Sequence, residues 1–112
     1  MKLISLENNE IVSENVIVAD TFKKRLFGLT IKNLNENECF LIPRCNSIHT
    51  IGMRYSIDVV FLDRHYRVIK IINSLKPFRF IPFVRSARNV LEFSAGFCYK
   101  EKIEIEDKLE LA

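Results

Sequence analysis

The chain has 112 residues, a hydrophobic fraction of 48% and a formal net charge of +3, which fits one ordinary globular domain. So small a positive charge does not by itself argue for a nucleic-acid or membrane partner. No segment approaches the length of a membrane-spanning helix, and the first fifteen residues lack the continuous apolar segment of a signal peptide. The three cysteines, Cys39, Cys45 and Cys98, show no pairing pattern, so we expect reduced thiols and a cytoplasmic location.

The N-terminal part predicts two strands followed by a short helix. Strands are expected at 3–6 and 11–18, around a polar turn that contains two asparagines. A helix is expected over 20–29, because its apolar residues fall at helical spacing and Gly28 can end it. Arg25 lies beside the apolar stripe of this helix, where its head group can either stay in solvent or reach inward.

The remainder of the chain predicts further strands joined by turns. Residues 57–62 are apolar on both faces apart from Asp58, which places this strand at the centre of a sheet. Residues 76–85 form an extended segment with two prolines. The other predicted strands are 39–43, 67–73, 89–93, 102–105 and 108–111. The pattern predicts a strand-dominated α+β fold, a compact barrel-like or strongly curved mixed sheet with one or two short helices.

Asp58 is the most informative single residue. It shares a face with Val60 and Leu62, so we expect its carboxylate to be at least partly buried. Such a group must be paired or accept several backbone N–H bonds, and Arg54 and Arg25 are candidate partners. A structural role that pins the preceding loop is favoured over catalysis, because structural ion pairs also perturb carboxylates.

Cys45 and His49 allow two reactive interpretations. A thiol near an imidazole can be an activated nucleophile, and both side chains can bind a metal. Neither has strong support, because there is no CxxC pair and zinc normally takes at least three protein ligands. Free cysteines are also often buried as small hydrophobes.

The loop over 49–53 allows a binding interpretation. Gly52 permits a backbone conformation closed to other residues, while His49 and Thr50 offer donors and acceptors for a small polar or anionic ligand, with Arg54 and Arg25 nearby. The alternative is a loop that packs over one end of the fold with Ile51 and Met53 as plugs. One sequence does not separate functional loops from packing loops.

The segment 76–88 combines basic and aromatic residues. Phe78, Phe80 and Phe83 can stack bases while the basic residues neutralise phosphates. We expect core packing instead, since Phe78 and Phe80 share one face of an extended segment and the charge excess elsewhere is slight.

Several short motifs, in this order, resemble those of the domain of unknown function 192 family. They are Ala19-Asp20-Thr21, Arg25-Leu26-Phe27-Gly28-Leu29, His49-Thr50-Ile51-Gly52-Met53, Ile57-Asp58-Val59-Val60-Phe61-Leu62-Asp63, Val90-Leu91-Glu92 and Ala95-Gly96. The resemblance covers most of the chain, although Thr30 stands where the family usually has Met and His65-Tyr66 replaces its usual Asp-Gly turn. It implies a small, mostly β domain with short helices and no agreed catalytic residues, ligand or reaction.

We therefore predict a non-enzymatic binding or accessory domain, with a pocket or partner surface formed by the 45–58 loop against the helix that bears Arg25. The expected site residues are Arg25, Cys45, His49, Thr50, Met53, Arg54 and Asp58. No cofactor is expected, and the expected partner is an unidentified small ligand or protein rather than nucleic acid or a membrane. The alternatives are a small enzyme or metal-binding protein using Cys45, His49 and Asp58, and single-stranded nucleic-acid binding through 76–88.

Overall fold

The chain is built mainly from short strands. The computed structural model describes residues 1–19 and 34–112, so the helix expected over 20–29, with Arg25, lies outside the described residues. The elements are β1 (Leu3–Ser5), β2 (Ile11–Ser13), β3 (Asn15–Val18), β4 (Glu38–Pro43), β5 (Ile48–His49), β6 (Ile57–Leu62), β7 (Val68–Leu75), β8 (Phe80–Ile81), β9 (Asn89–Ser94), α2 (Phe97–Lys100) and β10 (Leu109–Leu111). No helix in these two ranges is long and apolar enough to cross a membrane.

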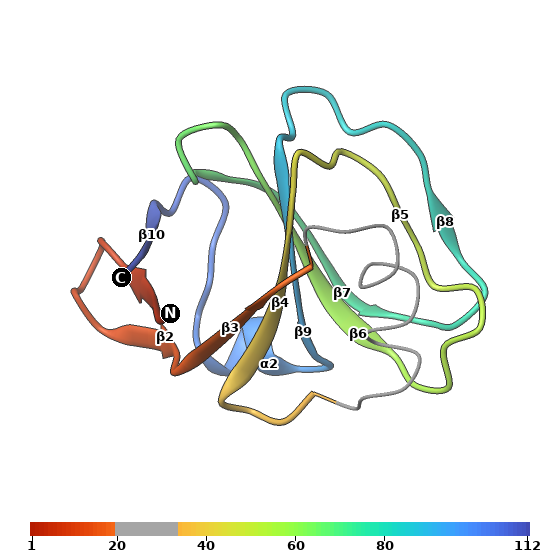
Figure 1. Ribbon diagram of the computed structural model, residues 1–112, viewed down its shortest axis with the longest axis horizontal. Coiled ribbons are helices and arrows are strands. Elements are labelled where there is room, and N and C mark those ends of the chain that lie inside the picture. Colours follow the sequence, from red (N-terminus) through yellow and green to blue (C-terminus); the bar gives the residue numbers. More distant parts are fainter. Residues whose placement is uncertain (20–33) are drawn as a thin grey trace.

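Five strands form a central sheet in the order β3-β4-β9-β6-β7 (Figure 1). β3 runs parallel to β4, and the other neighbours are antiparallel. Every residue of β6 is buried, and β6 lies between β9 and β7, which confirms the central position predicted for 57–62. β7 returns beside β6 after a turn in which the Asp63 carboxylate accepts hydrogen bonds from the N–H groups of His65 and Arg67, at 2.8 and 3.0 Å.

The two ends of the chain meet in a second sheet of three strands. β1 pairs antiparallel with β2 and β10, so that Leu3 lies opposite Leu111. The strand expected at 11–18 is interrupted at Glu14, and its halves β2 and β3 belong to different sheets. The strand expected at 102–105 is wrong, because Lys102 and Glu106 adopt positive φ angles of 56° and 79° and the segment forms turns.

β5 and β8 form a separate two-stranded ribbon, in which Ile48 lies opposite Ile81 and His49 opposite Phe80 (Figure 1). The strands thus divide among three sheets. A strand-dominated fold with mixed sheets and a short helix is confirmed. The expected barrel-like or strongly curved sheet is not found within the described ranges, because the strands belong to three separate sheets and only single contacts, such as the Arg67–Lys108 bridge, join the three-stranded sheet region to an edge of the central one.

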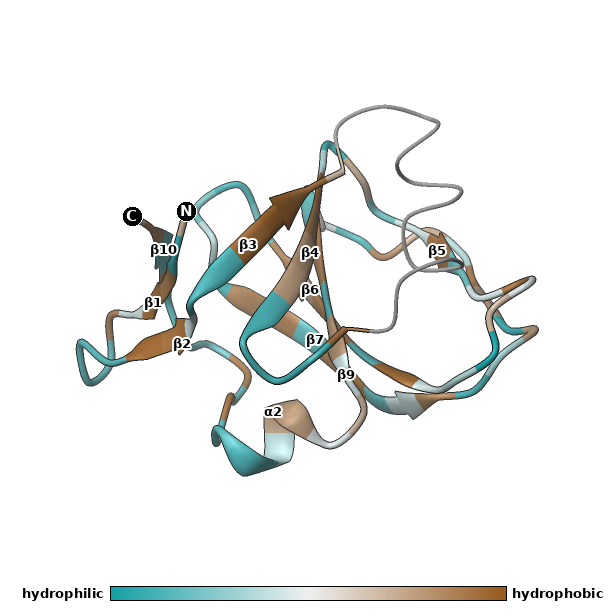
Figure 2. Cartoon of the chain, turned by 60° about the horizontal axis from the view of Figure 1, so that its bottom comes forward, coloured by the Kyte–Doolittle hydropathy of each residue, from teal (hydrophilic) through white to brown (hydrophobic). Residues whose placement is uncertain are grey.

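Apolar side chains pack against both faces of the central sheet. Alternate residues of β6 enter two core clusters, with Val59 in one and Val60 in the other, as the two-residue period of a strand requires. We call these the loop-side cluster, which contains Cys45 and Met53, and the helix-side cluster, which contains residues of α2. α2 lies near the end of β9 (Figure 2); there the rings of Phe93 and Phe97 stack with centroids 4.7 Å apart.

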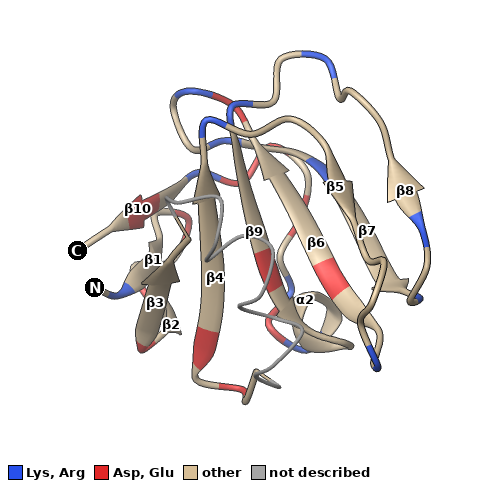
Figure 3. Ribbon diagram, turned by 45° about the vertical axis from the view of Figure 1, so that its right-hand side comes forward, with Lys and Arg blue, Asp and Glu red and all other residues tan. Residues whose placement is uncertain are grey.

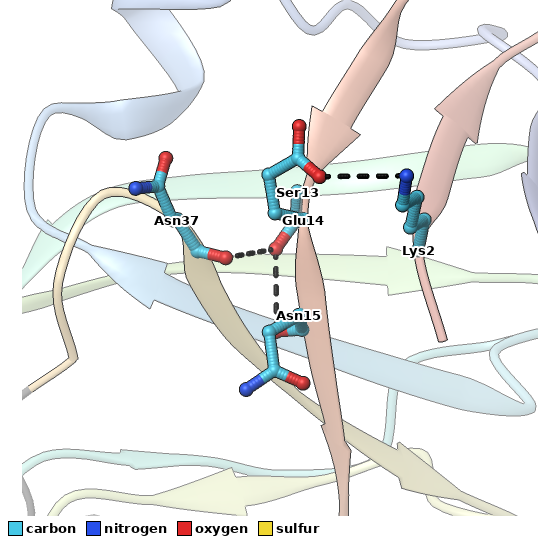
Figure 4. Close-up of polar contacts among 5 residues, drawn as sticks. All are labelled: Lys2, Ser13, Glu14, Asn15 and Asn37. Atoms are coloured by element: carbon cyan, nitrogen blue, oxygen red, sulfur yellow. Dashed lines mark hydrogen bonds and ion pairs between the residues drawn. The ribbon is translucent and has the colours of Figure 1, made fainter.

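Ser13 closes the corner between β2 and β3. The residue is 1% exposed, and its hydroxyl lies 3.1 Å from the Asn37 carbonyl oxygen and 3.4 Å from that of Asn15 (Figure 4). This buried donor therefore ties the corner to the start of β4. The neighbouring Lys2–Glu14 ion pair, at 3.7 Å, has both side chains more than half exposed and contributes little stability.

Candidate functional site

Asp58 is buried on the helix-side face of the central sheet. Its Oδ1 accepts a hydrogen bond from the Ser74 N–H at 2.8 Å, and its Oδ2 accepts one from the Cys98 N–H at 3.0 Å. The expected burial is confirmed, with backbone N–H groups as partners. Arg54 is exposed, and no ion pair among the described residues joins it to Asp58. Asp58 therefore links β6, β7 and α2.

Two of the three cysteines are made less reactive by their surroundings. Burial raises the pKa of the Cys39 thiol to about 11, against a hydrogen bond from Ser13 that lowers it. Burial also raises the pKa of the Cys98 thiol, and the charge of Asp58 and a hydrogen bond to it raise it further. Because the thiolate is the nucleophile and the metal ligand, neither of these cysteines is activated at neutral pH.

Cys45 and His49 have different environments. The Cys45 side chain is buried, and its thiol donates a hydrogen bond to the Ser47 carbonyl oxygen at 2.9 Å. The His49 side chain is exposed on β5. Across residues 1–19 and 34–112, no group of three or more His, Cys, Asp and Glu side chains is placed to hold a metal ion.

Thr50 is fully buried and connects the 49–53 loop to the segment before β8. Its hydroxyl donates to the Lys76 carbonyl oxygen at 2.7 Å and accepts a hydrogen bond from the Arg79 N–H at 2.8 Å. Gly52 follows with a φ of 86°, the conformation that glycine supplies without strain. Met53 is buried in the loop-side cluster, whereas Ile51 is 59% exposed, so only one of the two expected plugs packs over the core.

The expected site residues do not meet at one point among the described residues. Cys45 and Met53 pack on the loop side of the sheet, whereas Asp58 lies on the helix side. His49 and Arg54 are exposed. Among the described residues, Asp58 therefore does not share a face of the sheet with Cys45 and Met53.

Glu92 is a buried acidic residue that the sequence reasoning did not select as a site residue. It is 3% exposed and lies in β9 between Phe40 of β4 and Val59 of β6. Burial raises the pKa of the Tyr55 phenol, and the charge of Glu92 raises it further, which places Tyr55 near this carboxylate. The signal that singled out Asp58, one charge in an apolar strand, is also present here.

A cavity of about 520 Å³ lies where β4 ends and β9 begins. Three arginines line it: Arg44 after β4, Arg64 in the turn between β6 and β7, and Arg88 before β9. The other described lining residues carry no acidic group and are Cys45, Asn46, Tyr66, Ala87 and Asn89. We call this opening the basic cavity.

The backbone brings the arginines of the basic cavity together. The Arg88 N–H donates to the Leu62 carbonyl oxygen at 2.8 Å, and the Arg88 carbonyl oxygen accepts the Cys45 N–H at 2.9 Å. Arg44 and Tyr66 adopt positive φ angles of 52° and 63°, which is rare for residues with side chains. Six other described non-glycine residues also have positive φ angles, so this feature does not by itself mark the cavity.

The phenylalanines of the 76–88 segment are not in the core. Phe78, Phe80 and Phe83 are 69%, 63% and 67% exposed, so the expectation that Phe78 and Phe80 enter the core is wrong. The inward-facing position on β8 belongs to Ile81, which packs against the loop-side cluster, and the φ of 62° at Phe78 breaks the simple alternation on which the expectation rested.

Charge is unevenly distributed over the molecule (Figure 3). Residues 39–91 hold only two acidic residues, Asp58 and Asp63, against nine basic ones: Arg44, Arg54, Arg64, Arg67, Lys70, Lys76, Arg79, Arg85 and Arg88. A second cavity of about 510 Å³, between the β1–β2 turn and the segment after α2, has a lining with two lysines, Lys100 and Lys102, and five acidic residues, namely Glu7, Glu10, Glu101, Glu104 and Asp107. The basic cavity lies within the 39–91 portion.

Comparison with known proteins gives the family. The model of the DUF192 family, described as "Uncharacterized ACR", matches residues 4–111. The chain is 41% identical over 100 residues to a UPF0127 protein of Pyrococcus horikoshii, covering 85% of each chain, and 31% identical over 112 residues to one of Pyrococcus furiosus, covering 96% of each. A solved structure of a protein of unknown function from Novosphingobium aromaticivorans has the same fold, with a TM-score of 0.80 at 19% identity over 98% of this chain and 82% of the other. This chain belongs to the DUF192 (UPF0127) family.

Proposed function

We propose that this protein is a non-enzymatic binding domain that holds a small anionic ligand in the basic cavity, at the start of the 45–58 loop. The observation that supports this is the presence of Arg44, Arg64 and Arg88 around one cavity with no acidic residue among its described lining. The volume lies within the range of small-ligand pockets. The buried thiols of the described residues suit a reducing compartment, so a cytoplasmic location is part of the proposal.

The chemistry of the lining favours a phosphate-bearing ligand. A guanidinium group engages carboxylate or phosphate oxygens with two parallel hydrogen bonds, and three such groups together match the higher charge of a phosphate. The side-chain amides of Asn46 and Asn89 add neutral donors at the same opening. Catalysis has less support, because Asp58 is engaged by backbone N–H groups and burial raises the pKa values of the Cys39 and Cys98 thiols.

Isothermal titration calorimetry with inorganic phosphate and with pyrophosphate tests the proposal. We expect saturable binding, with Arg44→Ala and Arg88→Ala each weakening it by about tenfold, since a hydrogen bond to a charged group contributes roughly 1.5–3 kcal/mol. Arg54→Ala is the matched control, because Arg54 is equally exposed but does not line the cavity.

Two results would contradict the proposal. One is the absence of any binding of phosphate or pyrophosphate to the unmodified chain. The other is an equal loss of affinity in the Arg54→Ala and Arg88→Ala variants, since this would mean attraction to general positive charge rather than to the cavity.

A further inference from the structure

The β5–β8 ribbon has two different faces. Ile48 and Ile81 lie opposite each other and pack toward the loop-side cluster, while His49 and Phe80 lie opposite each other and are both exposed. Because directly opposite residues of an antiparallel pair point to the same face, the outer face of the ribbon carries an imidazole and a phenyl ring side by side.

Phe78 is held close to this outer face by the backbone. Its N–H donates to the Thr50 carbonyl oxygen at 3.0 Å, and the Thr50 N–H donates to the Arg79 carbonyl oxygen at 2.9 Å. Thr50 itself is fully buried, so the turn that presents Phe78 is anchored in the fold. A group of exposed large apolar side chains on an anchored element marks an interaction surface.

The charged residues close to these rings in the sequence are all basic. Lys76, Arg79 and Arg85 are exposed within the same segment, and no acidic residue occurs anywhere in 64–91 or in 39–57. The expected partner is therefore negatively charged and has flat or apolar groups that the rings can contact. We call Phe78, Phe80, His49, Arg79 and Arg85 the aromatic-basic surface.

We propose that the aromatic-basic surface binds single-stranded nucleic acid, with bases stacked on Phe78 and Phe80 and phosphates beside Arg79 and Arg85. Aromatic rings set in a positively charged strip are the usual means of holding single strands without sequence preference. The rings lie on a β-ribbon and include an imidazole, whereas surface binding to a bilayer typically uses an amphipathic helix with Trp, Phe or Leu on its apolar face. None of these five residues lines the basic cavity, so this proposal is independent of the proposed function.

A single indole introduced on the ribbon gives a direct test. The chain contains no Trp, so Phe80→Trp creates a unique fluorophore at an exposed position. We expect an oligothymidylate of about twelve nucleotides, a length within the usual site sizes, to quench its emission saturably. The midpoint should rise steeply with salt, because bound phosphates release counterions.

Anisotropy of a labelled oligothymidylate then separates stacking from general charge. We expect the double variant Phe78→Ala/Phe80→Ala to bind about tenfold or more weakly, as loss of base stacking implies. Tyr99→Ala is the matched control, because Tyr99 is 89% exposed on α2, outside the surface, and should leave binding unchanged. Arg79→Ala/Arg85→Ala should reduce the salt dependence, and Lys102→Ala should not.

Vesicles that contain phosphatidylserine test the alternative that this surface binds a membrane. A blue-shifted indole emission with these vesicles, together with no quenching by the oligonucleotide, would overturn the proposal in favour of a membrane surface. No response to either probe, or equal weakening by the Phe78→Ala/Phe80→Ala and Tyr99→Ala variants, would also overturn it.

Discussion

At the scale of single residues, Asp58 shows how a buried charge can be structural. Both of its carboxylate oxygens are occupied by backbone N–H groups, from Ser74 of β7 and from Cys98 of α2. It was predictable because one acidic residue interrupts an otherwise apolar strand. Its partners were not predictable, because they lie 16 and 40 residues away and pairing with Arg54 was an equally reasonable expectation.

Replacement of Asp58 by Ala should lower the free energy of unfolding by about 1–3 kcal/mol, because it leaves the buried Cys98 N–H without its acceptor. Urea denaturation followed by circular dichroism measures this change. Glu110→Ala is the control, since Glu110 is exposed and such substitutions usually change stability by no more than about 0.5 kcal/mol. An unchanged midpoint for Asp58→Ala would rule out the structural role.

The raised thiol pKa of Cys39 leads us to expect a loss of stability at high pH. Its thiol pKa is raised from 9.0 to about 11 by burial, so the protonated thiol favours the folded chain. This contribution is complete below the unfolded-state pKa of 9.0 and is lost as pH rises through about 11. The stability advantage of the unmodified chain over Cys39→Ala should therefore shrink by on the order of 2 kcal/mol between about pH 8 and pH 11. A difference that stays constant over this range would show that the thiol titrates normally.

At the scale of elements, the strands of the central sheet were well predicted and the ribbon was not. β6 and β9 each hold a buried apolar stretch with one acidic residue in it, a local signal. β5 and β8 pair through only two residues each, and the paired residues are about thirty positions apart in the sequence. No local sequence pattern indicates such a pairing. The wrong expectation for Phe78 and Phe80 has the same cause. Alternation alone does not say which face of an extended segment meets the core.

Thr50 should control the position of the ribbon. Thr50→Val removes the hydroxyl that bonds Lys76 and Arg79 while keeping a similar shape, so it should destabilise the chain by about 1–3 kcal/mol and speed hydrogen exchange at the Arg79 N–H. Thr50→Ser keeps the hydroxyl and is the control. Equal exchange rates in the two variants, measured by NMR, would contradict the anchoring role.

At the scale of the whole molecule, function is suggested by how the fold distributes charge. The net charge of +3 gave no reason to expect an anion site. It is the sum of a basic portion, residues 39–91, and a more acidic remainder. The segments after β4, after β6 and before β9 bring Arg44, Arg64 and Arg88 to one cavity. Convergence of this kind depends on strand order, which the sequence motifs did not specify.

The central claim is that the basic cavity binds an anion. An NMR titration of the full chain with pyrophosphate, followed through the backbone amide resonances, tests it most directly. The account predicts saturable shifts confined to residues 44–46, 64–66 and 87–89. Shifts spread evenly over the basic residues outside the cavity, such as Arg54 and Lys70, or no saturable shifts at all, would contradict it.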